Sequence, residues 1–148
     1  MPTTRVNEDA REIVTATLAE LPTGELIRTR TFAARADQVA YARAFIRTHL
    51  ADDPACDTVV LLVSELATNS IRHSRSRFFA VTLARIGPDR LRITVIDEGR
   101  AGIPYLPEIT VDTEGGRGIA VIDCLATRWG ITRLPDLGTA VWFECAGR

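Results

Sequence analysis

Three polar side chains recur at intervals of four residues within residues 64–73. If this segment is helical, Glu65, Asn69 and His73 are successive i, i+4 neighbours and form one polar stripe beside an apolar one. A carboxylate, an amide and an imidazole aligned in this way could coordinate a hydrated cation or activate a hydroxyl group, and the neutral amide oxygen suits Mg²⁺. The alternative is a solvated helix face, because Glu, Asn and His are ordinary surface residues.

A second candidate segment lies where the apolar run of residues 91–97 ends. Asp97 closes this run, and Gly99 and Gly102 follow it. A carboxylate at this place could accept a hydrogen bond from an exocyclic amine such as N6 of adenine, and the glycines would let the backbone approach a ligand closely. A strand that simply ends in a turn gives the same pattern, because Asp and Gly are common in turns.

Glycines are concentrated again directly before a third apolar stretch, residues 119–125. Gly115 and Gly116 precede Arg117, and Gly118 follows it. Exposed backbone N–H groups at the start of a helix make an anion site that needs no lysine, and Arg117 could add a charge-assisted hydrogen bond to a phosphate. The alternative is a flexible loop in which the glycines only turn the chain.

Composition limits the chemistry further, because all 18 basic residues are arginine and the chain has no lysine. This excludes a Walker A loop, the strand lysine of ordinary protein kinases, and lysine-dependent Schiff-base or pyridoxal phosphate catalysis. A bound nucleotide would therefore need backbone N–H groups, arginine or a metal ion at its phosphates. The net charge of −1 gives no overall attraction to nucleic acid or to an anionic membrane.

Length and cysteine content place the chain in a broad class. Its 148 residues, 46% of them hydrophobic, are enough for one domain with a substantial core. Cys56, Cys124 and Cys145 are odd in number and widely spaced, so they form neither a disulfide framework nor a zinc motif. No apolar run reaches about 18 residues and no signal-peptide core is present, so a cytoplasmic location is expected.

The elements that must position these segments follow from the hydrophobic periodicity. It predicts helices over residues 8–20, 36–50, 55–73 and 118–128, and strands over residues 26–33, 77–86, 91–97, 129–134 and 139–145. Residues 98–116 are read as a long irregular loop. The order of elements predicts an α+β fold, a two-layer sandwich of a mixed β-sheet with helices on one face. Residues 1–148 are expected to form a single domain with an N-terminal extension over residues 1–25.

The three segments occur together and in a fixed order, with Gly138-Thr139 added on the last predicted hairpin. From about Thr31 onward this set closely resembles the GHKL ATPase superfamily, in which the segments look like the N, G1 and G2 boxes. The resemblance implies the GHKL (Bergerat) ATP-binding fold. Within the superfamily, Ser64-Glu65-x-x-Thr68-Asn69-x-Ile71-x-His73 resembles the N box of the anti-sigma factor serine/threonine kinase branch.

The resemblance implies a role for each matching residue. Asn69 would bind a Mg²⁺ ion that bridges the phosphates of ATP. Asp97 would accept the adenine N6 hydrogen bond, Thr139 would support that contact through water, and Glu65 would be the general base for an attacking hydroxyl. The remaining matches would shape the adenine pocket or lie in a lid over the phosphates: Gly99, Gly102, Gly115, Gly116, Arg117 and Gly118.

Two departures from the superfamily pattern affect these assignments. The G1 segment reads Asp-x-Gly-x-x-Gly, one residue longer than the usual form, so Gly102 matches less well than Gly99. The G2 segment is short, so the lid over the phosphates is expected to be truncated. Asp97 and Asn69 are in place, so the pattern supports ATP binding more strongly than kinase activity.

The function implied by the resemblance is an ATP-dependent regulator that phosphorylates a serine or threonine of a small anti-sigma antagonist. Its partners would be that antagonist, a sigma factor, or both, without direct contact to nucleic acid or membrane. Related regulators are often dimers, and the apolar surface of residues 39–50 is one place for such an interface. Three alternatives stay open: a non-catalytic ATP-binding module, a detached histidine-kinase catalytic domain, and a scaffold without a ligand. Against the second, no helix with a phospho-acceptor histidine precedes the core, and His49 does not resemble one.

Overall fold

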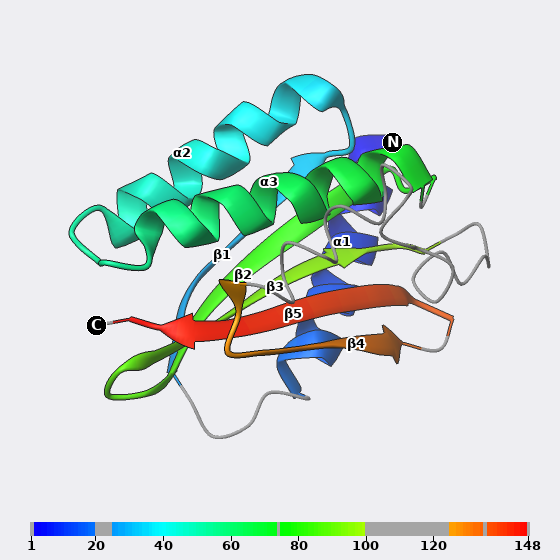
Figure 1. Ribbon diagram of the computed structural model, residues 1–148. Coiled ribbons are helices and arrows are strands. Elements are labelled where there is room, and N and C mark those ends of the chain that lie inside the picture. Colours follow the sequence, from blue (N-terminus) through cyan, green and yellow to red (C-terminus); the bar gives the residue numbers. More distant parts are fainter. Residues whose placement is uncertain (1, 20–24, 74, 100–124, 135, 148) are drawn as a thin grey trace.

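The computed structural model describes residues 2–19, 25–73, 75–99, 125–134 and 136–147 (Figure 1). In chain order, its elements are α1 (Pro2–Ala19), β1 (Glu25–Ala33), η1 (Ala36–Gln38), α2 (Val39–Leu50), α3 (Cys56–His73), β2 (Phe78–Gly87), β3 (Arg90–Asp97), β4 (Arg128–Leu134) and β5 (Gly138–Ala146). These bounds confirm the predicted strands to within about two residues. The predicted helix over residues 118–128 lies mostly outside the described residues, and its last residue, Arg128, belongs to β4 instead.

The five strands form one sheet in the order β1-β2-β3-β5-β4. The strand pairs β2–β3 and β4–β5 each form a hairpin, and the predicted hairpin that carries Gly138-Thr139 is thereby confirmed. Every described strand pair is antiparallel, so the α+β class is confirmed, whereas the prediction of a mixed sheet is wrong. The local sequence pattern does not indicate the relative direction of the two hairpins. In the structure, the hairpins lie side by side because β3 pairs with β5.

One face of the sheet is covered by α2 and α3 (Figure 1). Alternate residues of β2, including Phe79, Val81 and Leu83, point to this face and pack with the two helices in the main core. The apolar stripe of α2, which includes Phe45 and Ile46, is buried in this core. It is therefore unavailable as an interface with a second copy of the chain.

The opposite face of the sheet carries α1. Ala10, Ile13 and Val14 of this helix form a second buried cluster with Phe78 and Ala80, the β2 residues that alternate with the main-core ones. The prediction of helices on one face is therefore wrong for α1. The burial of β2 agrees with helices on both faces of the sheet. Residues 78–84 are all buried, as in a strand enclosed between two layers.

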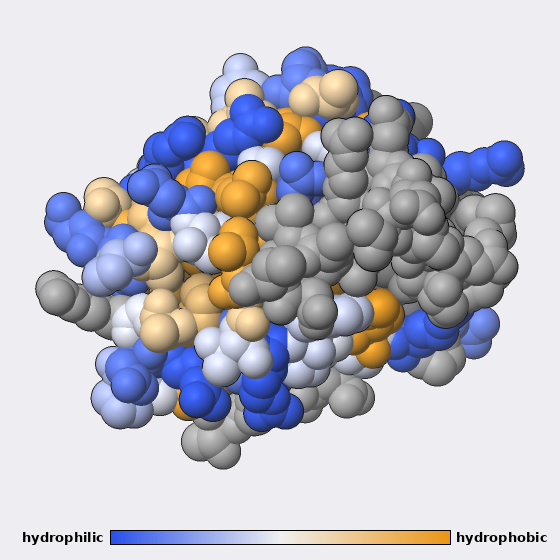
Figure 2. Space-filling view, in the orientation of Figure 1, coloured by the Kyte–Doolittle hydropathy of each residue, from blue (hydrophilic) through white to orange (hydrophobic). Residues whose placement is uncertain are grey.

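Hydrophobic and hydrophilic residues are mixed on the surface of the helical face. Figure 2 shows hydrophobic residues (orange) distributed among hydrophilic ones on the side that carries α2 and α3. Tyr41 and Leu61 are among the exposed large hydrophobic residues. Within the described ranges, no helix has the length and apolar character needed to cross a membrane.

Candidate functional site

Asp97 is the last residue of β3 and only 2% exposed. It pairs directly with Phe79 on β2 and with Thr139 on β5, and Thr139 pairs in turn with Arg133 on the edge strand β4. Directly paired residues of antiparallel strands lie on the same face, and Phe79 belongs to the core beneath the helices. The row Phe79, Asp97, Thr139, Arg133 therefore faces the α2–α3 layer.

Two short hydrogen bonds fix the carboxylate of Asp97. The hydroxyl of Ser70 on α3 donates to Oδ2 at 2.7 Å, and the backbone N–H of Gly99 donates to Oδ1 at 2.8 Å. Hydrogen bonds to a charged group are worth about 1.5–3 kcal/mol each. Together the two hydrogen bonds orient the carboxylate from the helix and from the backbone that follows β3.

Ser70 is a site residue that the sequence did not assign. Its position directly after Asn69, within the predicted polar segment, is the signal that could have found it. Ser70 is 4% exposed. What the pattern could not provide is its partner, which lies 27 residues away at the end of β3.

Gly99 occupies a place where no side chain fits. Its φ of 53° lies in the left-handed region, and a Cβ atom there would come within 2.7 Å of Oγ1 of Thr139. Gly138 also lies directly against this segment, because a Cβ atom at residue 138 would collide with the carbonyl oxygen of Asp97. The backbones of residues 97–99 and 138–139 are therefore in contact around the Asp97 carboxylate.

On α3, Asn69 and Glu65 are one turn apart, as the predicted stripe requires. Asn69 is buried, and Glu65 is half-buried. Because Asn69 adjoins Ser70, it lies one residue from the contact with Asp97. The structure thus brings the N-box segment and the Asp97 segment together. The side chain of His73 lies outside the described part of the chain.

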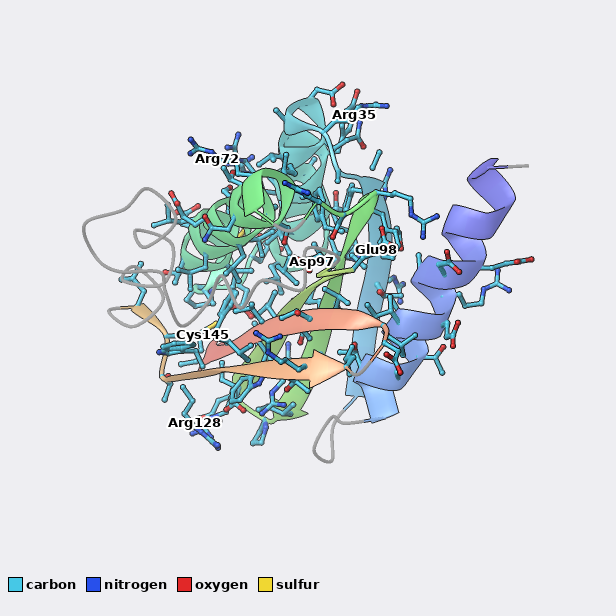
Figure 3. All side chains as sticks on the ribbon, turned by 90° about the vertical axis from the view of Figure 1, so that its right-hand side faces the viewer. Arg35, Arg72, Asp97, Glu98, Arg128 and Cys145 are labelled. Carbon is cyan, nitrogen blue, oxygen red and sulfur yellow. The ribbon has the colours of Figure 1, made fainter. Side chains whose placement is uncertain are left out.

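An ion-pair cluster adjoins the carboxylate on the side of α1, as Figure 3 shows for Glu98 relative to Asp97. Glu98 accepts hydrogen bonds from the guanidinium of Arg77 at 2.7–3.2 Å and from its backbone N–H at 2.8 Å. The same guanidinium donates to Asp9 of α1 at 2.6 Å. The hydrogen bonds to Glu98 and then Asp9 raise the pKa of Arg77 further above its ordinary value, so it is always charged.

Comparison with known protein families shows the family of the chain. Residues 32–145 match the family of the histidine kinase-like ATPase domain. The chain belongs to this family. The match begins near the end of β1 and ends in β5, so it leaves out α1 and most of β1 and includes the elements from η1 to β4 in full.

A solved structure of low sequence identity is also similar to this chain. A histidine kinase domain from the blue-light activated histidine kinase of Erythrobacter litoralis EL346 is 20% identical, covering 95% of this chain and 72% of that chain, with a TM-score of 0.46. The comparison with curated proteins found no match.

In a histidine kinase-like ATPase domain, the ligand expected from the family is ATP with Mg²⁺. Within the described ranges, no cluster of three or more His, Cys, Asp or Glu residues could hold a metal by itself. Asn69 would supply one neutral oxygen, which fits Mg²⁺, because this ion is usually bound by few protein ligands together with substrate phosphates. The residues present therefore fit the ion expected from the family.

Part of the predicted site lies outside the described residues. This holds for Gly102, predicted to shape the adenine pocket, and for the predicted lid residues Gly115, Gly116, Arg117 and Gly118. The described half of the site is the part built from α3, the end of β3 and the start of β5.

Proposed function

We propose that this histidine kinase-like ATPase domain binds Mg-ATP and transfers a phosphoryl group to a serine or threonine hydroxyl of a small regulatory protein. The observation that supports ATP binding most directly is the buried Asp97 carboxylate, held by Ser70 and Gly99 beside Thr139. A buried, oriented carboxylate is suited to accept a hydrogen bond from the exocyclic amine of adenine. Thr139, directly opposite, would support the same contact through water.

The residues on α3 would act at the phosphate end. Asn69 would hold the Mg²⁺ ion, which when bound neutralises charge on the phosphates. Glu65 would take the proton of the attacking hydroxyl as general base, a role worth roughly 10² to 10⁴ in rate. Its half-buried position, one turn from Asn69, supports this, because it is both near the metal ligand and accessible to a protein substrate.

The regulatory role is the finer part of the proposal. It rests on the likeness of residues 64–73 to the N box of anti-sigma factor kinases. The partners would be an anti-sigma antagonist as the phosphorylated protein and a sigma factor as the protein that is bound, in the cytoplasm. A homodimer is compatible with this role.

ATP binding is tested by titrating wild type, Asp97→Asn and the control Asp89→Asn with Mg-ATP. Asp89 is an exposed acidic residue in the β2–β3 turn, so its variant makes the same change of charge away from the site. Loss of one hydrogen bond to a charged group predicts roughly 10- to 100-fold weaker binding for Asp97→Asn alone. Equal affinity of all three proteins, or no saturable binding by wild type, would remove the assignment.

A second candidate is transfer to a histidine of a partner protein, which the family description itself favours. The two acceptors differ chemically, because a phosphohistidine is acid-labile whereas phosphoserine and phosphothreonine are acid-stable. ATP labelled in its γ-phosphate, incubated with this protein and cytosol of the source organism, distinguishes them. An acid-stable label that disappears with Glu65→Gln supports the serine/threonine reaction. An acid-labile label supports the second candidate, and tight ATP binding without any label supports a non-catalytic module.

A further inference from the structure

The corner that carries Asp97 is also held on the α1 side of the sheet, by contacts to the next residue, Glu98. Glu98 directly follows Asp97, and its side chain is 8% exposed. Arg77, just before β2, binds both carboxylate oxygens of Glu98 through its guanidinium and one of them through its own backbone N–H. The neighbouring Ser76 accepts a hydrogen bond from the backbone N–H of Glu98 at 2.8 Å. Residues 76–77 therefore fix both the backbone and the side chain of residue 98.

The helix α1 reaches the same corner at two places. Asp9 binds the guanidinium of Arg77 at 2.6 Å. One turn further along, Ile13 lies against Gly138 so closely that a Cβ atom there would collide with its Cδ1. Gly138 immediately precedes Thr139, so α1 contacts the segments that carry both members of the Asp97–Thr139 pair.

The two halves of the Asp9–Arg77–Glu98 cluster differ in exposure. Glu98 is nearly inaccessible, whereas the side chains of Arg77 and Asp9 are 35% and 39% exposed. Ion pairs that are open to solvent contribute little, because water and salt screen them. The Arg77–Glu98 half is therefore the better shielded one, and the Asp9–Arg77 half is the more strongly screened by solvent.

We propose that Arg77 is a positioning residue for the Asp97–Gly99 corner, and that α1, through Asp9 and Ile13, is coupled to the geometry of that corner. The corner keeps its binding geometry when α1 is seated on the sheet. Because coupling between two equilibria is reciprocal, a ligand that binds Asp97 stabilises the seated helix in return. Only the identity of that ligand, an adenine nucleotide, rests on the proposed function.

The first test needs no nucleotide. Amide hydrogen exchange is measured by NMR in wild type, Arg77→Gln, Asp9→Asn and the control Arg35→Gln, which breaks an exposed ion pair with Asp37 that includes neither Arg77 nor Glu98. We expect the amides of Glu98 and Gly99 to exchange at least tenfold faster in Arg77→Gln and measurably faster in Asp9→Asn. Arg35→Gln should leave them unchanged. Unchanged rates in Arg77→Gln would overturn the proposal whether or not the protein binds ATP.

The second test separates positioning from a general loss of stability. Affinities are measured for ATP and for inosine triphosphate, which lacks the N6 amine. We expect Arg77→Gln to lower the ATP-to-inosine triphosphate affinity ratio at least fivefold and Arg77→Lys to restore part of it. A purely structural role would weaken both nucleotides equally, and that result would overturn the proposal.

The reciprocal effect gives a third readout. Saturating ATP should slow amide exchange in α1 around Ala10–Val14 of wild type but much less in Asp9→Asn, which keeps Arg77 and Glu98. Equal protection in both proteins would exclude coupling through Asp9. If Arg77→Gln does not fold, Asp9→Asn and Arg77→Lys still decide the proposal through the amides of Glu98 and Gly99. If wild type binds neither nucleotide, the proposed function fails, while the first test still stands.

Discussion

The hydroxyl of Ser70 on α3 donates a hydrogen bond of 2.7 Å to Oδ2 of Asp97 at the end of β3. Both residues are buried, so this contact joins the helical layer to the sheet without competition from water. It also places Asn69, the residue before Ser70, close to the segment that ends β3. The orientation of the Asp97 carboxylate therefore depends on α3 as well as on its own strand.

Substitution of Ser70 by alanine should lower both the stability of the protein and its affinity for ATP, because it removes this hydrogen bond. Loss of a hydrogen bond to a buried carboxylate is expected to lower the free energy of unfolding by about 1.5–3 kcal/mol. It should also weaken Mg-ATP binding, because one oxygen of Asp97 loses its fixed orientation. Urea denaturation and nucleotide titration measure the two effects.

Ser64→Ala is the matched control on the same helix. Ser64 is only half-buried, and its hydroxyl interacts with Arg43 and with the carbonyl of Val60, away from Asp97. We expect a smaller loss of stability and unchanged ATP affinity. Equal effects of Ser64→Ala and Ser70→Ala on ATP binding would contradict the role assigned to the Ser70–Asp97 contact.

Gly99→Ala should disturb the site through the backbone. The left-handed conformation of residue 99 costs a side chain about 1–2 kcal/mol, and the new Cβ would press on Oγ1 of Thr139. Gly87→Ala is the control, since a Cβ there meets only Cβ of Arg90 at an ordinary 3.9 Å. Thermal unfolding and ATP titration of both variants give the comparison. A Gly99→Ala protein as stable as Gly87→Ala would mean that the corner can relax.

Local patterns in the sequence were sufficient to predict the helix and the strands that carry the site. The i, i+4 spacing of Glu65 and Asn69, the apolar run that ends at Asp97 and the turn before Thr139 each predict an element that the structure contains. These signals are local, because side-chain periodicity reports which face of a single helix or strand is buried. They also predicted the helix over residues 36–50, which the structure contains as α2 with a buried apolar stripe.

Contacts between distant segments could not be predicted in the same way. Ser70 with Asp97, and Arg77 with Glu98 and Asp9, join residues that are 21–68 positions apart. Nothing in the pattern of α1 indicates which face of the sheet it covers, and this led to the incorrect prediction of helices on one face. The antiparallel direction of β3 and β5 is likewise set by the packing of whole hairpins.

The ion pair between Glu144 and Arg92 on the α1 side of the sheet should affect stability without affecting the site. Glu144 is 1% exposed and accepts hydrogen bonds from Arg92 at 2.7 and 3.2 Å. The same guanidinium lies 4.0 Å from the ring centroid of Trp142. Removing one partner of a buried pair leaves the other charge uncompensated, so Glu144→Gln should lower the free energy of unfolding by about 3 kcal/mol.

The control for this prediction is Glu12→Gln on the exposed side of α1. It should change stability by less than about 0.5 kcal/mol. Because Glu144 and Asp97 point to opposite faces of the sheet, the folded Glu144→Gln protein should bind Mg-ATP as wild type does. A loss of affinity comparable with that of Asp97→Asn would show that the two faces are not independent.

The buried thiol of Cys145 should make the protein less stable in alkaline solution. Burial, with a smaller contribution from the charge of Asp53, raises the pKa of Cys145 from an ordinary 9.0 to about 11. Between these two pH values the folded thiol keeps a proton that the unfolded thiol has lost. The free energy of unfolding therefore falls as the pH rises from 9 to 11, by about 2–3 kcal/mol if the whole shift is expressed.

Cys145→Ala loses some packing at every pH, so the informative quantity is the slope of the urea midpoint between pH 8 and 10.5. We expect a shallower slope in the variant, and parallel slopes would mean that the Cys145 thiol ionises equally in the folded and unfolded states.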